Sequence, residues 1–269
     1  MYKYFVISDI HGFYQPMLRA LRKAGFRKSN PKHILIVCGD IFDRGPDNVR
    51  VYKYLRSIPK NRRILIRGNH EYLLRYAVER GYFKDHDWYN GTVETILEFV
   101  RYYYPGVLDS GSNALRCFRN TGVLSWIFGT EWRHYYELDE YVFAHSWVPV
   151  QNPTGSHIIT LSPESGYRSL MFDPDWRNAS ESEWEECTWG CPWALYLAGC
   201  VPPGKTMVCG HWSARDFRLH IDHTPKADSS FDLYTNRGLV ALDACTARTG
   251  FCNVFVFEKD HGPEFGLSK

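Results

Sequence analysis

The sequence predicts an α/β fold in which short buried strands alternate with amphipathic helices. Three observations support this. A strand-loop-helix pattern occurs three times before residue 81, each strand is a short apolar run, and polar residues gather in the loop between each strand and its helix. The chain has 269 residues, and no linker-like stretch or internal repeat divides it. We therefore expect a single domain over residues 1–269.

The first unit begins with a predicted strand from Tyr2 to Ser8, which is followed by Asp9-Ile10-His11-Gly12. A helix is predicted from Gln15 to Ala24, because apolar residues recur there at helical spacing. Gly25 ends this helix, since glycine readily adopts the left-handed conformation that often follows a last helical turn.

The second and third units repeat the pattern. Strands are predicted at Ile34 to Cys38 and Arg63 to Arg67. The helix of the second unit is predicted from Asp47 to Ser57, and that of the third unit follows Gly68-Asn69-His70-Glu71 and ends at about Glu79. The loops between them are Gly39-Asp40-Ile41-Phe42-Asp43-Arg44-Gly45 and Gly68-Asn69-His70-Glu71. Open α/β sheets place their chemistry at the carboxyl ends of strands, so these loops are where we expect a site.

Beyond residue 80 the pattern changes. Residues 81–133 are predicted to form a helical insertion or cap over the site, with helices at Thr92 to Tyr103 and near Leu124 to Phe128. Residues 150–200 are predicted to form an irregular region with helical pieces. The remaining predictions are helices at Gly166 to Met171 and Trp193 to Ala198, strands at Glu137 to Ala144, Lys205 to Cys209, Gly238 to Ala244 and Cys252 to Glu258, and a loose tail from His261 to Lys269.

Composition excludes several functional classes. The formal net charge is +2, so the chain lacks the basic surface that DNA binding requires, and no apolar run reaches membrane-spanning length. We expect a cytoplasmic protein with reduced cysteines. Cys187, Cys191 and Cys200 are the most suggestive thiols, but their spacing differs from the C-x₂-C pairs of common zinc sites.

Six polar residues end strands that should lie side by side. Alone, each has an ordinary explanation, such as a helix cap for an aspartate or a turn for an asparagine. Together, carboxylate, imidazole and amide groups without a thiolate suit Mn²⁺, Fe²⁺ or Zn²⁺. Six ligands are more than one ion needs when it keeps some coordination positions open, so two divalent ions are predicted. The six candidate ligands are Asp9, His11, Asp40, Asn69, His145 and His211.

The order and spacing of these motifs resemble the calcineurin-like metallophosphoesterases. The match is closest to their phosphoprotein phosphatase branch, which includes Ser/Thr protein phosphatases and symmetrical dinucleoside tetraphosphatases. This resemblance implies a four-layer α-β-β-α sandwich of two mixed sheets with a helical insertion near the site. The motifs are Asp9-x-His11, Gly39-Asp40-x-x-Asp43-Arg44-Gly45, Gly68-Asn69-His70-Glu71, His145 and Gly210-His211.

The resemblance also assigns roles to these residues. It implies two metal ions, manganese first with iron or zinc as alternatives, and a water between them as the nucleophile. Asp43 would orient a general acid, His70, and Arg44 with Asn69 would contact the phosphate. The family's second phosphate-binding arginine is matched best by Arg177, with Arg168 as a rival. The implied ligands are Asp9, His11 and Asp40 for the first ion and Asp40, Asn69, His145 and His211 for the second. One departure from the family pattern is Ser146-Trp147 after His145, where we expect the bulky Trp147 to wall the pocket.

For the substrate, a phosphorylated Ser or Thr of a protein is the first expectation. The alternative is a dinucleoside polyphosphate of the Ap4A type or another phosphodiester. Trp88-Tyr89-Asn90-Gly91 with Thr95 resembles a segment of the tetraphosphatases. Trp88, Tyr89 and Trp126 would then stack on adenine, unless they pack inside the insertion. His70 is present, which disfavours a non-catalytic scaffold. The predicted partners are thus a phosphoprotein or a phosphorylated small molecule, with neither DNA nor a membrane, and the oligomeric state is left open.

Overall fold

The structure is a computed structural model that describes residues 1–107, 111–151 and 170–265. Its first sheet has five strands, and every neighbouring pair is parallel except the pair of the first and last strands along the chain. In spatial order these strands are β12 (Phe255–Lys259), β1 (Tyr2–Ile7), β2 (His33–Cys38), β3 (Arg63–Ile66) and β4 (Trp132–Arg133).

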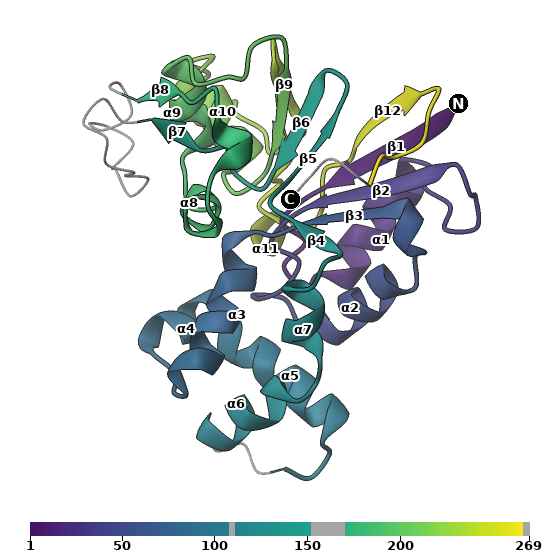
Figure 1. Cartoon of the computed structure of the whole chain (residues 1–269), viewed down its shortest axis with the longest axis vertical. Coiled ribbons are helices and arrows are strands. Elements are labelled where there is room, and N and C mark those ends of the chain that lie inside the picture. Colours follow the sequence, from purple (N-terminus) through teal and green to yellow (C-terminus); the bar gives the residue numbers. More distant parts are fainter. Residues whose placement is uncertain (108–110, 152–169, 266–269) are drawn as a thin grey trace.

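The second sheet also has five strands and mixes parallel with antiparallel pairs. Its spatial order is β10 (Tyr234–Asn236), β11 (Leu239–Ala241), β9 (Thr206–Cys209), β6 (Tyr141–Ala144) and β5 (Tyr135–Leu138). A small antiparallel pair, β7 (Val150–Gln151) with β8 (Met171–Phe172), lies at its margin (Figure 1).

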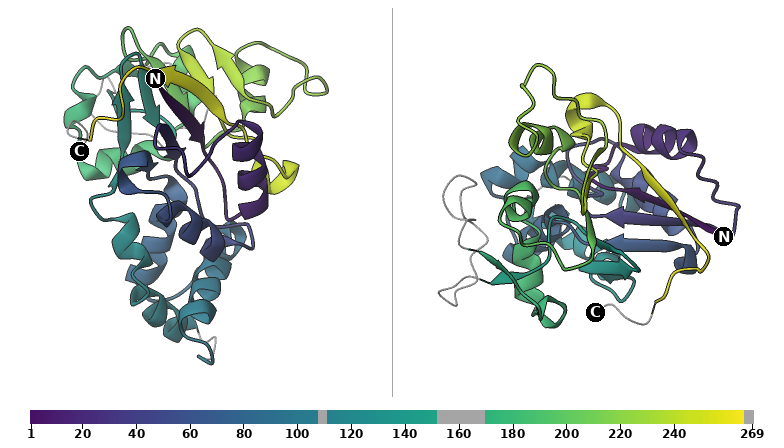
Figure 2. Two further views of the ribbon diagram at one scale, coloured as in Figure 1. Left: turned by 90° about the vertical axis from the view of Figure 1, so that its right-hand side faces the viewer. Right: turned by 90° about the horizontal axis from the view of Figure 1, so that it is seen from above.

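Successive side chains of a strand point to opposite faces of its sheet. The inner faces of the two sheets pack against each other. In β1, Tyr4 and Val6 point inward and pack in one cluster with Phe143 of the second sheet, whereas Phe5 and Ile7 point to the outer face. The outer faces are covered by helices, so the predicted four-layer α-β-β-α sandwich of two mixed sheets is confirmed (Figure 2).

Two groups of helices provide the outer layers. The first sheet is covered by α1 (Tyr14–Lys23) and α2 (Asn48–Arg56), and the second by α8 (Glu181–Cys187), α9 (Pro192–Leu197) and α10 (Ala214–His220). Shorter pieces are η1 (Lys60–Arg62), η3 (Trp176–Asn178) and α11 (Thr246–Thr249).

The helical insertion projects from one end of the sandwich (Figure 1). It consists of α4 (Asp85–Asn90), α5 (Thr92–Tyr103), α6 (Gly111–Arg119) and α7 (Val123–Ile127), packed on α3 (Asn69–Arg80). Helix α5 has the predicted bounds. It contacts α2 and α3, so the insertion shares its core with the first sheet.

Several sequence predictions need correction. The strand predicted from Glu137 to Ala144 is a hairpin, because the chain turns at Asp139 with a φ of +50°. The helix predicted at Gly166 to Met171 is wrong at Met171, which lies in β8, and residues 166–169 lie outside the described part. The tail predicted to be loose is held at residue 264, whose backbone N–H donates to the hydroxyl of Tyr136 over 3.2 Å. Among the described helices, none is long and apolar enough to cross a membrane.

Candidate metal centre

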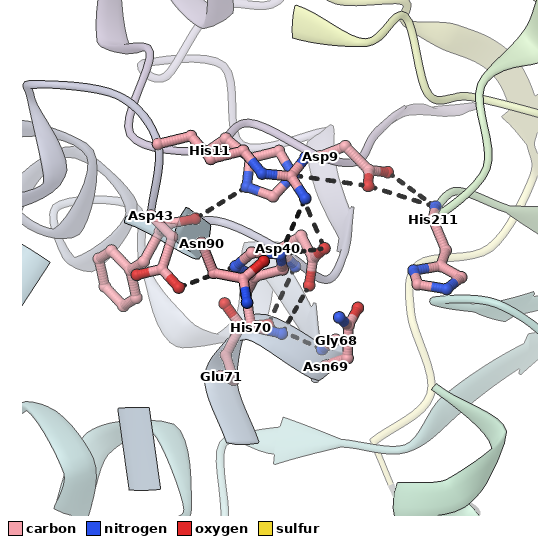
Figure 3. A network of polar contacts seen from close by, with 12 residues as sticks. Asp9, His11, Asp40, Asp43, Gly68, Asn69, His70, Glu71, Asn90 and His211 are labelled. Atoms are coloured by element: carbon pink, nitrogen blue, oxygen red, sulfur yellow. Dashed lines mark hydrogen bonds and ion pairs between the residues drawn. The ribbon is translucent and has the colours of Figure 1, made fainter. Parts of the chain in front are cut away.

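The candidate site lies at the carboxyl ends of strands from both sheets, where their loops meet beside the helical insertion (Figure 3). Asp9 and His11 follow β1, Asp40 follows β2, His145 follows β6 and His211 follows β9. Asn69 begins α3 just after β3. The structure therefore brings together side chains separated by up to two hundred positions, and it buries all of them except the half-buried His211.

The backbone of these loops is unusual. Side chains other than glycine rarely adopt positive φ, and each such residue stores conformational strain of about 1–3 kcal/mol. The strain is sustained by bonds between neighbouring loops, such as the His11 N–H to the Asp40 carbonyl over 2.9 Å. Six predicted site residues have φ between +48° and +72°: Asp9, His11, Asp40, Asp43, Arg44 and His211.

Glycines allow these loops to approach each other closely. A Cβ at Gly68 would overlap Oδ1 of Asp40, and a Cβ at Gly210 would overlap the carboxylate of Asp9. The glycines of the Gly-Asn-His-Glu and Gly-His motifs are therefore required by the approach of a side chain from another loop.

Asp40 lies at the middle of the cluster. Its Oδ1 is 3.4 Å from Nε2 of His145, and its Oδ2 is 3.7 Å from Nε2 of His11. Two groups of three ligating atoms can be formed among the described residues, and Asp40 belongs to both. One group is His11, Asp40 and His70, and the other is Asp40, His145 and His211. Asp9 joins the His11 side, with Oδ1 at 4.0 Å from Nε2 of His11. This is the arrangement expected of a carboxylate that bridges two ions.

The histidine tautomers suit metal binding. His11 donates from Nδ1 to the Phe42 carbonyl over 3.0 Å, and His145 donates from Nδ1 to the Cys38 carbonyl over 2.9 Å. Each ring then turns the lone pair of Nε2 toward the centre, as metal-binding histidines do. Nε2 of His145 lies 2.9 Å from Oδ1 of Asn69, so two acceptors face each other. A shared cation would stabilise this otherwise repulsive pair.

Burial sets the charge state of the donors. It raises the pKa of Asp9 to about 6 and that of Asp40 to about 7, since desolvation penalises the charged carboxylate. Burial also lowers the pKa of His11, His145 and His211, which keeps their imidazoles neutral. Neutral imidazoles and carboxylates that lack a buried counter-charge fit a pair of divalent cations.

A second pair of side chains lies beside the centre. Nδ1 of His70 is 2.8 Å from Oδ2 of Asp43, as the resemblance implied. Asp43 also accepts hydrogen bonds of 2.8 Å from the hydroxyls of Thr92 and Thr95 on α5. The insertion thus orients the Asp43 carboxylate.

Arg44, an exposed residue in an otherwise buried loop, reaches into the centre. It donates to Nε2 of His70 over 3.2 Å and to Nε2 of His11 over 3.1 Å. Burial and this guanidinium lower the pKa of His70 well below its usual value. The Asp43 contact fixes the orientation of the ring, with Nδ1 toward the carboxylate and Nε2 toward Arg44.

Three sequence predictions do not hold at this site. Arg177 is not near it, because its guanidinium binds both carboxylate oxygens of Glu137 over 2.7 and 2.8 Å. Its rival Arg168 lies outside the described residues. Trp147 does not wall the pocket, since it is buried in the core of the second sheet and donates to the Cys200 carbonyl. Trp126 is buried within the insertion and is therefore unavailable for stacking.

Two residues at the site were not predicted. Glu71 is fully buried and accepts the backbone N–H groups of Asp40, Ile41 and Gly68 over 2.7 to 3.0 Å, so it ties the loop after β2 to the loop after β3. Asp243 is buried near Asp9, and burial together with the Asp9 charge raises its pKa. Asp243 comes shortly after β11. It could therefore have been found by the rule that site residues follow the carboxyl ends of strands.

Comparisons with known proteins agree with this arrangement. The family model described as calcineurin-like phosphoesterase matches residues 2–212. A symmetrical bis(5'-nucleosyl)-tetraphosphatase of Buchnera aphidicola subsp. Schizaphis graminum is 40% identical over 67 residues, which are 25% of this chain and 23% of that protein. An asymmetrical bis(5'-nucleosyl)-tetraphosphatase, PrpE of Bacillus velezensis, is 36% identical over 74 residues, 25% of this chain and 30% of that protein.

These curated relatives are matched over less than a third of their own length. Among solved structures, a cold-active protein-tyrosine phosphatase of a psychrophilic Shewanella species has a TM-score of 0.50 at 14% identity, covering 97% of this chain and 76% of that one. At this identity the likeness concerns the fold alone.

Proposed function

Because the chain belongs to the calcineurin-like phosphoesterase family, a family of phosphoester hydrolases, we propose that it is a two-metal hydrolase that cleaves dinucleoside polyphosphates. The observation that carries the reaction class is the position of Asp40 between two sets of ligating atoms, with the His70–Asp43 pair beside it. Asp9, His11 and Asp40 would hold one ion, and the second would be held by Asp40, Asn69, His145 and His211. When bound, the ions lower the pKa of a water molecule and hold the phosphoryl oxygens.

The chain's own groups bind the phosphate and move a proton. Arg44 presents a guanidinium fork, which matches the geometry of phosphate oxygens. It already reaches Nε2 of His11 and His70, so a phosphate held by Arg44 lies beside His70. The negative charge of that phosphate raises the pKa of His70 and opposes the effect of burial. His70, oriented by Asp43, then protonates the leaving oxygen.

Two exposed aromatic side chains support a nucleotide substrate. Trp88 and Tyr89 on α4 are 53% and 88% exposed, so a large part of each ring is free to stack on a base. Helix α4 ends at Gly91, whose Cα packs so closely on Arg44 that a Cβ would overlap the Arg44 backbone. The aromatic pair thus lies in the chain just before a glycine that contacts the phosphate-binding arginine. The matched relatives are tetraphosphatases of dinucleosides, which also supports this substrate class.

Hydrolysis of phosphoserine or phosphothreonine in proteins, our first expectation, has less support. It relied on a compact two-metal site with an arginine clamp and a wide, irregular rim, and a dinucleotide hydrolase can share these features. The activities for which the matched relatives are named favour the dinucleotide. This activity therefore serves as the competing outcome in the experiment below.

The test is a side-by-side turnover assay with manganese supplied. The substrates are a dinucleoside tetraphosphate, a phosphoserine peptide, an aryl phosphodiester and p-nitrophenyl phosphate. We expect the largest kcat/KM for the dinucleotide. A higher value for the peptide would assign the protein to the phosphatases instead.

A variant pair tests the stacking surface. Tyr89→Ala should raise KM for the dinucleotide by about ten-fold, since stacking on one base contributes about 1–3 kcal/mol. Tyr102→Ala is the matched control, because Tyr102 is also exposed but lies near the far end of α5, about 15 Å along the helix from Gly91. Equal effects of the two changes would contradict stacking at Tyr89.

A further inference from the structure

A pocket of about 450 Å³ opens beside the metal centre, within the size range of ligand sites. Arg44 and His211 line it, so it is continuous with the site described above. Its remaining walls come from α10, from the segment between α10 and β10, and from α11. The residues that matter for its chemistry are Arg215, Lys226, Phe231 and Arg248.

The cations of this pocket have no acidic partners. Arg215, Lys226 and Arg248 form no ion pair with a carboxylate in the described part of the chain, whereas the half-buried Arg75 and Arg80 each pair with one. Nε of Arg215 is buried without a hydrogen-bond partner, while its terminal NH₂ group donates to the Lys226 carbonyl over 2.5 Å. The charge of the Arg215 guanidinium is therefore not compensated by a carboxylate, and a bound anion would compensate it.

One aromatic ring holds two of these cations in place. The guanidinium of Arg215 lies 5.3 Å from the centre of the Phe231 ring, and that of Arg248 lies 5.7 Å from the same centre. Cation-π contacts at this distance restrain both side chains without neutralising their charge. Two guanidinium groups are therefore held near each other at the wall of the pocket.

Two carboxylates also line the pocket, but both have other partners. Asp216 accepts hydrogen bonds from the backbone and the hydroxyl of Ser213 over 3.1 and 2.6 Å. Asp243 accepts the backbone N–H of Cys245 over 2.6 Å. The pocket therefore keeps an excess of positive charge: four cationic side chains, Arg44 included, against two carboxylates.

The geometry points to a second anion site: this pocket binds the phosphates of the substrate that lie beyond the bond being cleaved. The inference rests on the proposed function, because a dinucleoside polyphosphate extends a chain of phosphates away from the metal centre. Arg44 would contact the reacting phosphate, and Arg215, Lys226 and Arg248 the following ones. A substrate with a single phosphate cannot reach these side chains. The pocket would thus determine specificity for the length of the phosphate chain.

The experiment uses inorganic tripolyphosphate as the probe and p-nitrophenyl phosphate hydrolysis as the readout, with manganese held in excess over all phosphates. Tripolyphosphate should inhibit the wild-type protein competitively. Arg248→Gln should raise its inhibition constant about ten-fold, since each lost charge-assisted hydrogen bond to a phosphate weakens binding by that order. Arg248 is exposed, so this change should leave the fold intact. Arg215→Gln tests the buried donor, with thermal melting as a check on folding.

Arg237→Gln is the matched control, since Arg237 is an exposed arginine on the turn between β10 and β11, outside the pocket. An unchanged inhibition constant in both pocket variants would overturn the proposal. So would an equal change in the control, which would indicate a general effect of surface charge. If the pocket variants instead raised KM for an acidic phosphoserine peptide without affecting tripolyphosphate, the pocket would serve peptides and the proposal would fail.

This design separates the two proposals. A protein that hydrolyses no dinucleotide, but is inhibited by tripolyphosphate through Arg215 and Arg248, would contradict the proposed substrate while retaining the anion site. A protein that hydrolyses dinucleotides equally well with and without these arginines would retain the proposed function and contradict the site.

Discussion

Nδ1 of His70 lies 2.8 Å from Oδ2 of Asp43, and both residues are buried beside the metal centre. His70 also lies within 3.9 Å of Asp40 through its Nε2, so distance alone would permit it to be a ligand. Its Nδ1 bond to Asp43 also suits a residue that handles a proton, and this is the role that we propose. These two roles make different predictions.

His70→Asn should therefore retain both ions and lose most turnover. General acid catalysis contributes about 10²–10⁴-fold, so kcat should fall by at least about 100-fold. Elemental analysis of the purified variant measures the metal content beside a kinetic assay. Loss of one ion per chain in this variant would place His70 among the ligands.

Thr92→Val should lower kcat by about ten-fold and change KM little. The hydroxyl of Thr92 donates to Oδ2 of Asp43, the same oxygen that His70 contacts, and a charge-assisted hydrogen bond of this kind contributes about 1.5–3 kcal/mol. Thr235→Val, at an exposed position in β10, is the control. A Thr92 variant as active as this control would show that α5 does not act on the site through Asp43.

Much of the centre could be predicted because its residues share one positional rule. Asp9, Asp40 and His145 each follow an apolar strand, and parallel strands bring their carboxyl ends to one edge. The continuous apolar run in β1 is also typical of a strand that is buried on both faces, and β1 does lie between the second sheet and helices.

Other features depend on contacts that local sequence does not encode. Arg177 was chosen from its place between two histidines, but its position is set by Glu137 on the neighbouring strand β5. Thr92 lies on a separate helix, and nothing near it in the chain indicates its bond to Asp43. The hairpin at Asp139 was missed although two consecutive polar residues, Asp139 and Glu140, interrupt the apolar alternation at the turn.

Glu71 makes a prediction about stability. Replacing its carboxylate by the amide in Glu71→Gln turns an NH₂ group toward backbone N–H donors of the loops after β2 and β3. An unsatisfied buried donor costs about 1–3 kcal/mol, so the free energy of unfolding should fall by that amount. Urea denaturation measures it, with Glu79→Gln on the exposed face of the same helix as the control. Equal midpoints for the two variants would contradict this role.

Asp40→Asn should weaken both ions together, because an amide offers one neutral oxygen where the carboxylate offers a charged oxygen to each side. Asp9→Asn should weaken only the ion on the His11 side. Titration of each variant with manganese, followed by electron paramagnetic resonance, distinguishes them. If Asp40→Asn released one ion and left the other with its original affinity, Asp40 would not be a bridge.

The central claim is that Asp40 joins two ions at the meeting point of loops from both sheets. Anomalous diffraction from crystals grown with manganese tests it most directly. We predict two anomalous peaks, both within bonding distance of the Asp40 carboxylate, with Asp9 and His11 on one and Asn69, His145 and His211 on the other. A single peak, or a peak bound by Nε2 of His70 in place of Asp9, would contradict the account.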